Sequence, residues 1–92
     1  MKVKVQFHGI LTDWMGVARA EIEVPEGGTL RDLYSAVKKT YGRSMPPQLS
    51  EKDPEALHRA LWAIRGKDRL AEVHTELREG EEIQILLTLA GG

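Results

Sequence analysis

Apolar and polar side chains alternate in two runs near the start of the chain. In residues 2–7, polar residues separate Val3, Val5 and Phe7, and residues 17–24 alternate in the same way. A period of two places one set of side chains on each face of a β-strand. We therefore expect two strands that each bury one face and pair as an antiparallel hairpin. The inward residues of the second run are predicted to be Ala18, Ala20, Ile22 and Val24.

The segment between these runs, residues 11–16, contains the turn-forming residues Asp13 and Gly16 and is predicted to be a connecting loop. Trp14 lies in this loop, where it either packs over the edge of the sheet or anchors a partner protein. Trp62 lies in a later predicted strand whose buried face the pattern does not identify. We expect Trp62 in the core rather than at an interface.

A helical period begins after the Pro25-Glu26-Gly27-Gly28 break. Thr29 and Asp32 have the spacing of an N-terminal capping pair, and Gly42 is a typical C-terminal stop. Between them the apolar side chains share one stripe of the helix surface. We predict the main helix at about 29–42. Its stripe consists of Leu30, Leu33, Tyr34, Val37 and Tyr41.

The middle of the chain is less regular. Pro46-Pro47 excludes a helix through residues 43–52. Asp53-Pro54 has the pattern of a cap followed by proline at the first helical position, so a short extra helix is predicted at about 54–60. Residues 61–65 have strand character and residues 66–68 are predicted to turn. Residues 70–76 are either a short strand or irregular.

The C-terminal segment contains a turn, a strand and a glycine tail. Residues 77–82 have the polar, glycine-containing chemistry of a tight turn, and residues 83–89 are a nearly continuous apolar run of strand length. If Ile83, Ile85 and Leu87 face the helix, Leu86 lies on the outer face of this strand. Leu86 is then either a docking position or an isolated exposed leucine.

The chain ends in Ala90-Gly91-Gly92. Residues without side chains let a backbone pass through a narrow channel, and residues 89–92 span about 14 Å when extended. Such a tail can carry a carboxylate into the active site of a partner enzyme. The alternative is a glycine end without a role.

Composition and charge argue against several classes of site. The 92 residues suffice for one core, and a formal net charge of −1 gives no reason to expect nucleic acid. The chain has no cysteine and three scattered histidines, so no metal site is expected. No membrane-spanning segment or targeting leader is apparent, and we expect a soluble, cytoplasmic protein. No phosphate-binding loop or nucleophile motif is present, so the chain is not expected to be an enzyme by itself.

The charges are uneven near the C-terminal segment. From Lys67 onward the chain carries six acidic residues against three basic ones. This imbalance either favours docking to a basic surface or reflects a solvated acidic turn.

The chain resembles the MoaD/ThiS family of ubiquitin-like sulfur-carrier proteins, closer to the MoaD side. The turn at 77–82, the apolar strand after it and Ala90-Gly91-Gly92 carry the resemblance, and residues 3–7 and 28–33 match the family's first strand and helix start. Two features depart from the family pattern. Family members that serve molybdopterin synthesis often have Pro-Pro before the final residues, where this chain has Thr88-Leu89. The loop at 43–53 is also longer than in compact members, and both departures leave the pathway open.

The resemblance implies an α+β fold of the ubiquitin-like β-grasp type. In this fold a mixed sheet of four to five strands packs on one main helix, at about 29–42 here, with a short extra helix at about 54–60. The crossover through the main helix brings the first and last strands together as a parallel pair. Residues 1–88 are then a single domain, and residues 89–92 are a flexible tail.

The resemblance also implies that the chain acts as a cosubstrate. A ubiquitin-activating-type partner enzyme, using ATP and Mg, is expected to adenylate the Gly92 carboxylate, and sulfur then converts it to a thiocarboxylate. The chain itself is expected to bind no cofactor. The expected acceptor is the large subunit of molybdopterin synthase or another sulfur-acceptor enzyme, in molybdopterin or tungstopterin synthesis. The expected partner contacts are Gly91, Ala90, Leu89 and Leu86.

Two other functions remain open for the same tail. An activated Gly92 is also what a ubiquitin-like protein modifier uses to form an isopeptide bond with a lysine. Alternatively, the chain is a non-catalytic β-grasp interaction module whose terminal glycines are incidental.

Overall fold

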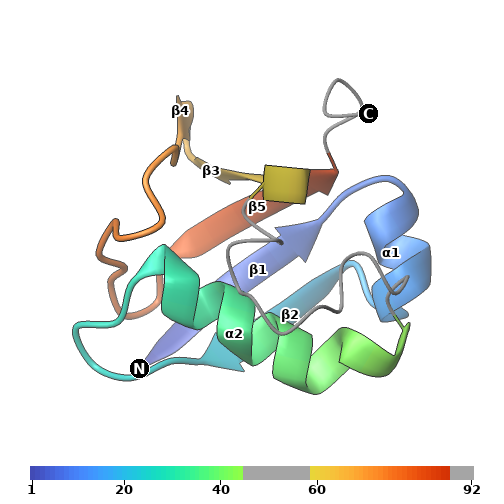
Figure 1. Ribbon diagram of the computed structural model, residues 1–92, viewed down its shortest axis with the longest axis horizontal. Helices are drawn as coiled ribbons and strands as arrows, with labels where there is room; N and C mark the ends of the chain where they lie inside the picture. The colour runs from blue at the N-terminus through green and yellow to red at the C-terminus, as the bar shows by residue number, and fades with distance from the viewer. Residues whose placement is uncertain (45–58, 88–92) are drawn as a thin grey trace.

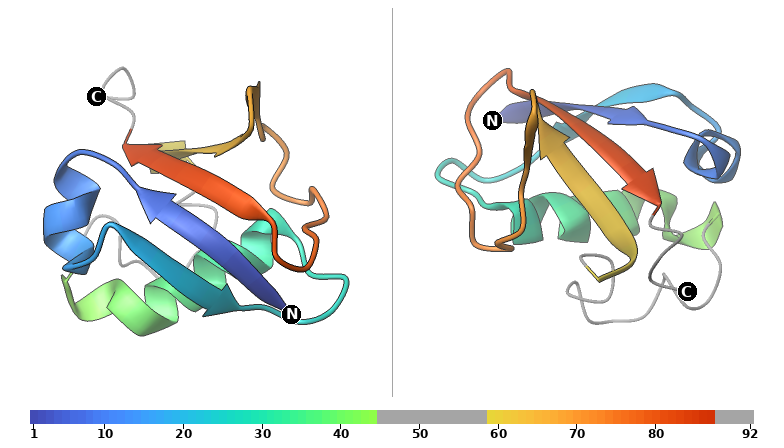
Figure 2. Two further views of the ribbon diagram at one scale, coloured as in Figure 1. Left: turned by 180° about the vertical axis from the view of Figure 1, so that it is seen from behind. Right: turned by 90° about the horizontal axis from the view of Figure 1, so that it is seen from above.

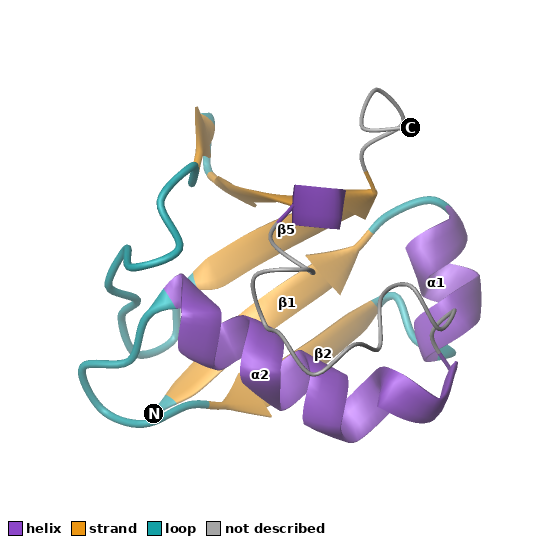
Figure 3. Ribbon diagram, viewed as in Figure 1, coloured by secondary structure: helices purple, strands orange, loops and turns teal. Residues whose placement is uncertain are grey.

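The computed structural model describes residues 1–44 and 59–87 of the chain. In those ranges, five strands form one mixed sheet in the order β2-β1-β5-β3-β4, and α2 packs across one face of it (Figures 1 and 3). The strands are β1 (Lys2–Phe7), β2 (Arg19–Glu23), β3 (Leu61–Arg65), β4 (Asp68–Arg69) and β5 (Glu82–Leu87). The helical elements are α1 (Ile10–Met15), α2 (Leu30–Tyr41) and the 3-10 turn η1 (Gly42–Ser44).

The sheet has the predicted topology. β1 pairs antiparallel with β2 and parallel with β5, and β5 pairs antiparallel with β3. The first and last strands are therefore central neighbours, connected through the α2 crossover, as in a β-grasp fold. In the view from behind, the strands lie in front of α2, so α2 covers only one of the two faces of the sheet (Figure 2, left).

The core lies between α2 and the inner face of the sheet. The alternation predicted for β1 is confirmed, because Val3, Val5 and Phe7 are all buried. The predicted stripe of α2 is buried as well, except for Tyr41, which is half-buried with its ring edge-on at 5.8 Å from that of Phe7. Burial raises the pKa of the Tyr34 phenol, opposed by the nearby charge of Arg69, so this core residue stays neutral.

The predicted caps of the main helix are present. The Thr29 N–H donates to Asp32 Oδ2 at 2.8 Å, which forms half of a capping box. At the other end, the Gly42 N–H donates to the carbonyl of Lys38. The main helix predicted at about 29–42 is therefore confirmed to within one residue at each end.

The loop predicted at residues 11–16 is wrong, because α1 occupies this segment. Leu11 and Met15, four residues apart, lie on one helical face and are both buried. Gly16 ends the helix with a φ of 75° and donates its N–H to the Thr12 carbonyl at 3.0 Å. Asp13 and Gly16 suggested a turn, but a helix of six residues is held mainly by tertiary packing, which local sequence does not reveal.

Two other boundaries differ from the prediction or lie outside the described ranges. β2 begins at Arg19, and Ala18, predicted to face inward, is exposed. Most of the helix predicted at 54–60 and of the loop predicted at 43–52 lies outside the described residues, although Arg59 and Ala60 are helical. Residues 70–76 are irregular except for an isolated bridge between Thr29 and Glu76.

Gly28→Ala is expected to lower the free energy of unfolding by about 1–3 kcal/mol. A Cβ at Gly28 would lie 2.7 Å from the Pro25 carbonyl oxygen, which already accepts the Gly28 N–H at 2.8 Å. A backbone oxygen has no rotamer to escape into, so the turn before α2 must shift. Urea denaturation of the purified variant measures this loss.

Gly42→Ala is the matched control, because its added Cβ would have Lys38 Cγ at 4.0 Å as its nearest neighbour and its φ is −55°. This substitution should be neutral or stabilise the chain by about 0.4–1 kcal/mol. Equal losses in the two variants would contradict the steric argument.

Candidate functional site

The C-terminal strand is held at the centre of the sheet. β5 lies between β1 and β3, with Ile83 opposite Val5 and Ile85 opposite both Phe7 and Ala63. Central strands are hydrogen-bonded on both sides, so the end of β5 is a fixed point from which the following residues extend. The predicted site residues Leu89, Ala90, Gly91 and Gly92 lie outside the described residues; Leu86 lies within them.

An apolar surface surrounds the end of β5 on the outer face of the sheet. Leu86 is directly opposite Trp62. Trp62 is 40% exposed, and the Arg69 guanidinium lies 4.3 Å from the centroid of its ring. On the other side of Leu86, α1 lies beside the ends of β1 and β5 (Figure 1). Its Ile10 is 48% exposed. We call Ile10, Trp14, Trp62 and Leu86 the exit surface, because it borders the point where the tail leaves the sheet.

Part of the exit surface is hollowed into a cleft of about 460 Å³. Its lining consists of the apolar residues Ile10, Trp14, Leu86 and Leu87 together with His8 and Gly9, which follow β1. The His8 Nε2 atom is buried and has no hydrogen-bond partner among the described residues. The cleft is therefore bordered mainly by apolar side chains, and His8 beside it carries a buried nitrogen without a partner in the described part of the chain.

The exposure of Trp62 corrects the sequence-based expectation that it lies in the core. Leu61 and Ala63 on either side of it are buried, so the alternation of the strand turns Trp62 outward. This alternation was obscured because Trp62 and Ile64 are apolar as well. Trp14 is on a helix rather than in a loop, and it packs partly against the core.

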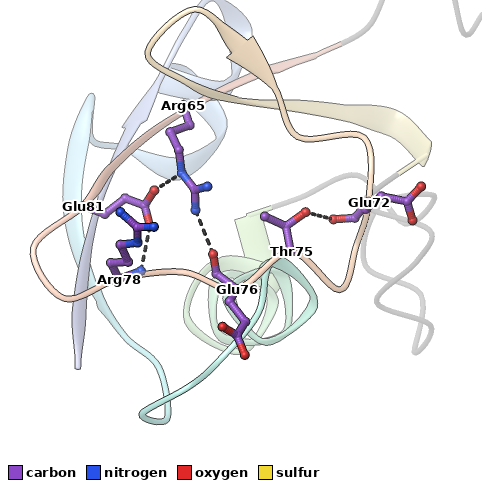
Figure 4. A network of polar contacts seen from close by, with 6 residues as sticks. All are labelled: Arg65, Glu72, Thr75, Glu76, Arg78 and Glu81. Carbon is purple, nitrogen blue, oxygen red and sulfur yellow. Dashed lines mark hydrogen bonds and ion pairs between the residues drawn. The ribbon is translucent and has the colours of Figure 1, made fainter.

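A polar network fixes the turn that leads into β5. In Figure 4 the Arg65 side chain points at the Glu81 carboxylate and at the backbone carbonyl of Glu76. Arg65 forms an ion pair with Glu81 and donates from Nη2 to the Glu76 carbonyl at 2.8 Å. The Arg78 backbone N–H donates to the second Glu81 oxygen at 2.7 Å. One carboxylate thus connects β3 to the turn before β5.

The acidic region predicted near the tail is smaller than its charge count suggests. Glu81 is engaged with Arg65, and Glu79 accepts a hydrogen bond from the Lys2 backbone N–H at 2.7 Å. The ion pair offsets the charge of Glu81, whereas Glu79 is exposed and keeps its negative charge while it accepts the backbone N–H.

Arg65→Ala is expected to lower the free energy of unfolding by about 2 kcal/mol. It removes the partner of Glu81, whose side chain is only 10% exposed, and one donor to the Glu76 carbonyl. Arg78→Ala is the matched control, because the contact made by Arg78 uses its backbone N–H and survives the change. The control should stay within about 0.5 kcal/mol of the parent in urea denaturation. The network would have no energetic role if both variants unfolded at the same urea concentration.

Two further properties of the described ranges concern metal ions and membrane-spanning helices. No group of three or more His, Cys, Asp or Glu side chains there is placed to hold a metal ion. The described helices are also too short and too polar to cross a membrane.

No protein-family model matches the sequence, and neither does any curated protein. Solved structures do match the fold. SAMP1 from Haloferax volcanii aligns over 100% of both chains with a TM-score of 0.72 and 14% identity. A second structure, of small archaeal modifier protein 1 from H. volcanii, covers 96% of this chain and 98% of its own at a TM-score of 0.69 and 13% identity.

A third structure extends the resemblance to the sequence. A protein from Pyrococcus furiosus assigned as molybdopterin converting factor, subunit 1, is 25% identical over 97% of this chain and 99% of its own, with a TM-score of 0.70. The ubiquitin-like β-grasp fold predicted from the sequence is thus confirmed, and the neighbours support the resemblance to the MoaD/ThiS family.

Proposed function

We propose that this ubiquitin-like β-grasp chain, a relative of the MoaD/ThiS proteins, is a sulfur carrier that is activated at its Gly92 carboxylate by a partner enzyme. The observation that carries the proposal is the position of β5. The strand that leads to Ala90-Gly91-Gly92 is the central strand of the sheet and ends beside an exposed apolar surface. This arrangement suits a rigid body that docks outside an enzyme while its tail reaches in.

The proposed chemistry has two steps, both in the active site of the partner. A carboxylate oxygen of Gly92 attacks the α-phosphorus of ATP, and pyrophosphate leaves as the new P–O bond forms. Hydrosulfide, or a sulfur donor of the same oxidation state, then attacks the carbonyl carbon. AMP leaves with the electron pair of the C–O bond, and loss of a proton gives the thiocarboxylate. The partner supplies the nucleotide site, Mg²⁺ and the groups that stabilise the developing charge.

The residues of this chain contribute binding and positioning. Gly91 and Ala90 allow the tail to enter a narrow channel, because glycine and alanine carry little or no side chain. Leu89 and Leu86 contact the partner, and Trp62 extends the docking area beside Leu86. An exposed aromatic side chain next to aliphatic ones is typical of the centre of a protein interface. The chain is thus a cosubstrate and binds no cofactor of its own.

The acceptor we propose for the sulfur is the large subunit of molybdopterin synthase or a functionally similar enzyme of molybdopterin or tungstopterin synthesis. The resemblance to the P. furiosus protein assigned as molybdopterin converting factor, subunit 1, supports this choice.

The second candidate function is conjugation to protein lysines. It is favoured by the two H. volcanii structures, one of which is named as a small archaeal modifier protein. Both candidate functions need the same activated Gly92, and they differ only in whether sulfur or a lysine amine displaces AMP.

The activation step is tested with the chain and the purified adenylating enzyme of its host, incubated with Mg²⁺ and ATP. The expected product is the chain carrying one AMP at Gly92, which intact mass detects. Pyrophosphate should be released at the same time and is measured separately. A chain lacking Gly92 is the control and should give neither product. Absence of the adenylate with an enzyme that is active on another carrier would overturn the proposal.

A further inference from the structure

The two edges of the sheet differ in how much strand they leave open. At one edge, β4 has only two residues, so this edge has few backbone N–H and C=O groups with which another strand could pair. At the other edge, β2 has five residues and, among residues 1–44 and 59–87, pairs on one side only, with β1. An open edge of this length is where an extended segment of another protein could add to the sheet.

The register identifies the backbone groups that β2 leaves open. The Phe7 N–H donates to the Ala18 carbonyl and the Val24 N–H donates to the Met1 carbonyl, both at 2.8 Å. Hydrogen-bonded pairs alternate along an antiparallel ladder, so Ala20 and Ile22 also turn their backbone groups toward β1. The N–H and C=O groups of the intervening residues therefore point to the open edge. These residues are Arg19, Glu21 and Glu23.

A groove lies beside this edge, between β2 and the C-terminal half of α2. It has a volume of about 450 Å³. Its lining combines the apolar side chains of Ile22, Ala36 and Tyr41 with the polar residues Glu21, Glu23, Lys39 and Thr40. Seen from behind, α2 crosses β2 at an angle on the far side of the sheet (Figure 2, left), so the groove lies where the C-terminal half of α2 passes this edge. A strand added to β2 would turn every second side chain toward α2 and thus into this groove.

The strand that β2 already binds shows which chemistry its outer face accepts. In the observed register, Lys2 of β1 lies opposite Glu23 and Lys4 lies opposite Glu21, while Val3 and Val5 face inward. Glu21 and Glu23 are both exposed, and Glu23 forms an ion pair with the N-terminal ammonium of Met1 at 3.4 Å. Glu21 therefore contributes more of the negative charge that a strand on the open side would meet. Opposite charges directly across a strand pair are favourable and like charges are not.

We propose that β2 binds an extended segment of a partner protein in which basic residues alternate with apolar ones. The basic residues would lie opposite Glu21 and Glu23 on the outer face, and the apolar ones would occupy the groove. Lys39 lines the helix side of the groove, so a segment that is basic on both faces is disfavoured. This surface is separate from the exit surface, since β2 is an edge strand and β5 is central.

The probe for this proposal is a fluorescein-labelled synthetic peptide, Lys-Val-Lys-Val-Gln-Phe, which has the sequence of residues 2–7. Fluorescence anisotropy should show saturable binding to the full chain. A peptide with glutamate in place of both lysines should bind at least about tenfold more weakly. Equal binding of the two peptides would overturn the charge argument.

Backbone pairing is tested by two further peptides, one N-methylated at the lysines and the other at the valines. Each change removes the N–H groups of one edge of the peptide, and only one edge can pair with β2. One methylated peptide should therefore lose binding and the other should retain it. Equal effects of the two sets would rule out strand addition.

The location is tested with Glu21→Lys, for which Glu72→Lys is the matched control because Glu72 is exposed and lies outside β2. Glu21→Lys should weaken peptide binding about tenfold and the control should not. In amide NMR spectra, shifts should concentrate on β2 and on residues 36–41. Shifts around Trp62 and Leu86 would place the peptide on the exit surface and contradict the proposal.

The chain could also associate with itself through β2. If the chain alone self-associates and Glu21→Lys abolishes this, the occupant is a second copy and the partner-segment proposal is wrong.

Discussion

Gly91→Val is expected to reduce adenylation of the Gly92 carboxylate by about 100-fold or more, a loss typical of a reacting group displaced by about 1 Å. In the proposed mechanism the last residues pass through a narrow channel of the partner enzyme. Valine brings a branched side chain and removes the conformations with positive φ that glycine adopts freely. We expect the stability of the domain to be unchanged, because every core residue within the described ranges precedes Gly91 in the sequence.

The rate of pyrophosphate release at saturating ATP measures this effect. Thr88→Val is the matched control, because it places the same side chain immediately before the tail and outside the proposed contact residues. It should retain most of the parent activity. If Gly91→Val and the parent chain react at the same rate, the partner has no narrow channel around Gly91 and the role proposed for the glycines is wrong.

Leu86→Glu is expected to weaken binding to the adenylating enzyme by about 30- to 100-fold, which corresponds to roughly 2–3 kcal/mol. Leu86 lies between exposed Trp62 and the cleft beside α1, so it is the centre of the exit surface. A carboxylate buried there without a partner would lose its hydration. Because Leu86 is only half-buried in the free chain, the change should cost little folding stability.

Gln84→Glu is the control for this prediction, since Gln84 lies on the same face of β5, two residues before Leu86. It adds the same charge to the strand but away from the tail. Titration calorimetry with the purified enzyme should show nearly parental affinity for Gln84→Glu. If both variants bind as tightly as the parent, the partner docks elsewhere. If both lose affinity equally, the effect is one of net charge rather than of the exit surface.

The elements that hold the tail were predictable where the sequence pattern is strictly periodic. Val3, Val5 and Phe7 alternate with polar residues, and Thr29, Asp32 and Gly42 mark both ends of the main helix; the structure has a strand and a helix at these positions. The parallel pairing of β1 with β5 followed from the order of the elements and the crossover through α2.

The parts that could not be predicted depend on contacts between distant residues. Nothing near Leu11 in the sequence indicates that a helix of six residues will be stabilised against the ends of β1 and β5. The outward face of Trp62 was hidden because both faces of β3 carry apolar residues. The Arg65–Glu81 ion pair joins residues 16 positions apart, and only the folded chain shows that Glu81 is engaged rather than free to bind a partner.

The central claim is that Gly92 is activated and then receives sulfur. The most direct test is the intact mass of the chain after incubation with its host's extract, ATP and a sulfide source, beside a chain without Gly92. The account predicts replacement of one carboxylate oxygen by sulfur in the parent chain and no change in the control. Addition of a whole second protein through Gly92 would identify a modifier instead of a carrier. An unchanged C-terminus in an extract that activates another carrier would contradict the account. The chain would then be a β-grasp interaction module whose C-terminal glycines are not modified.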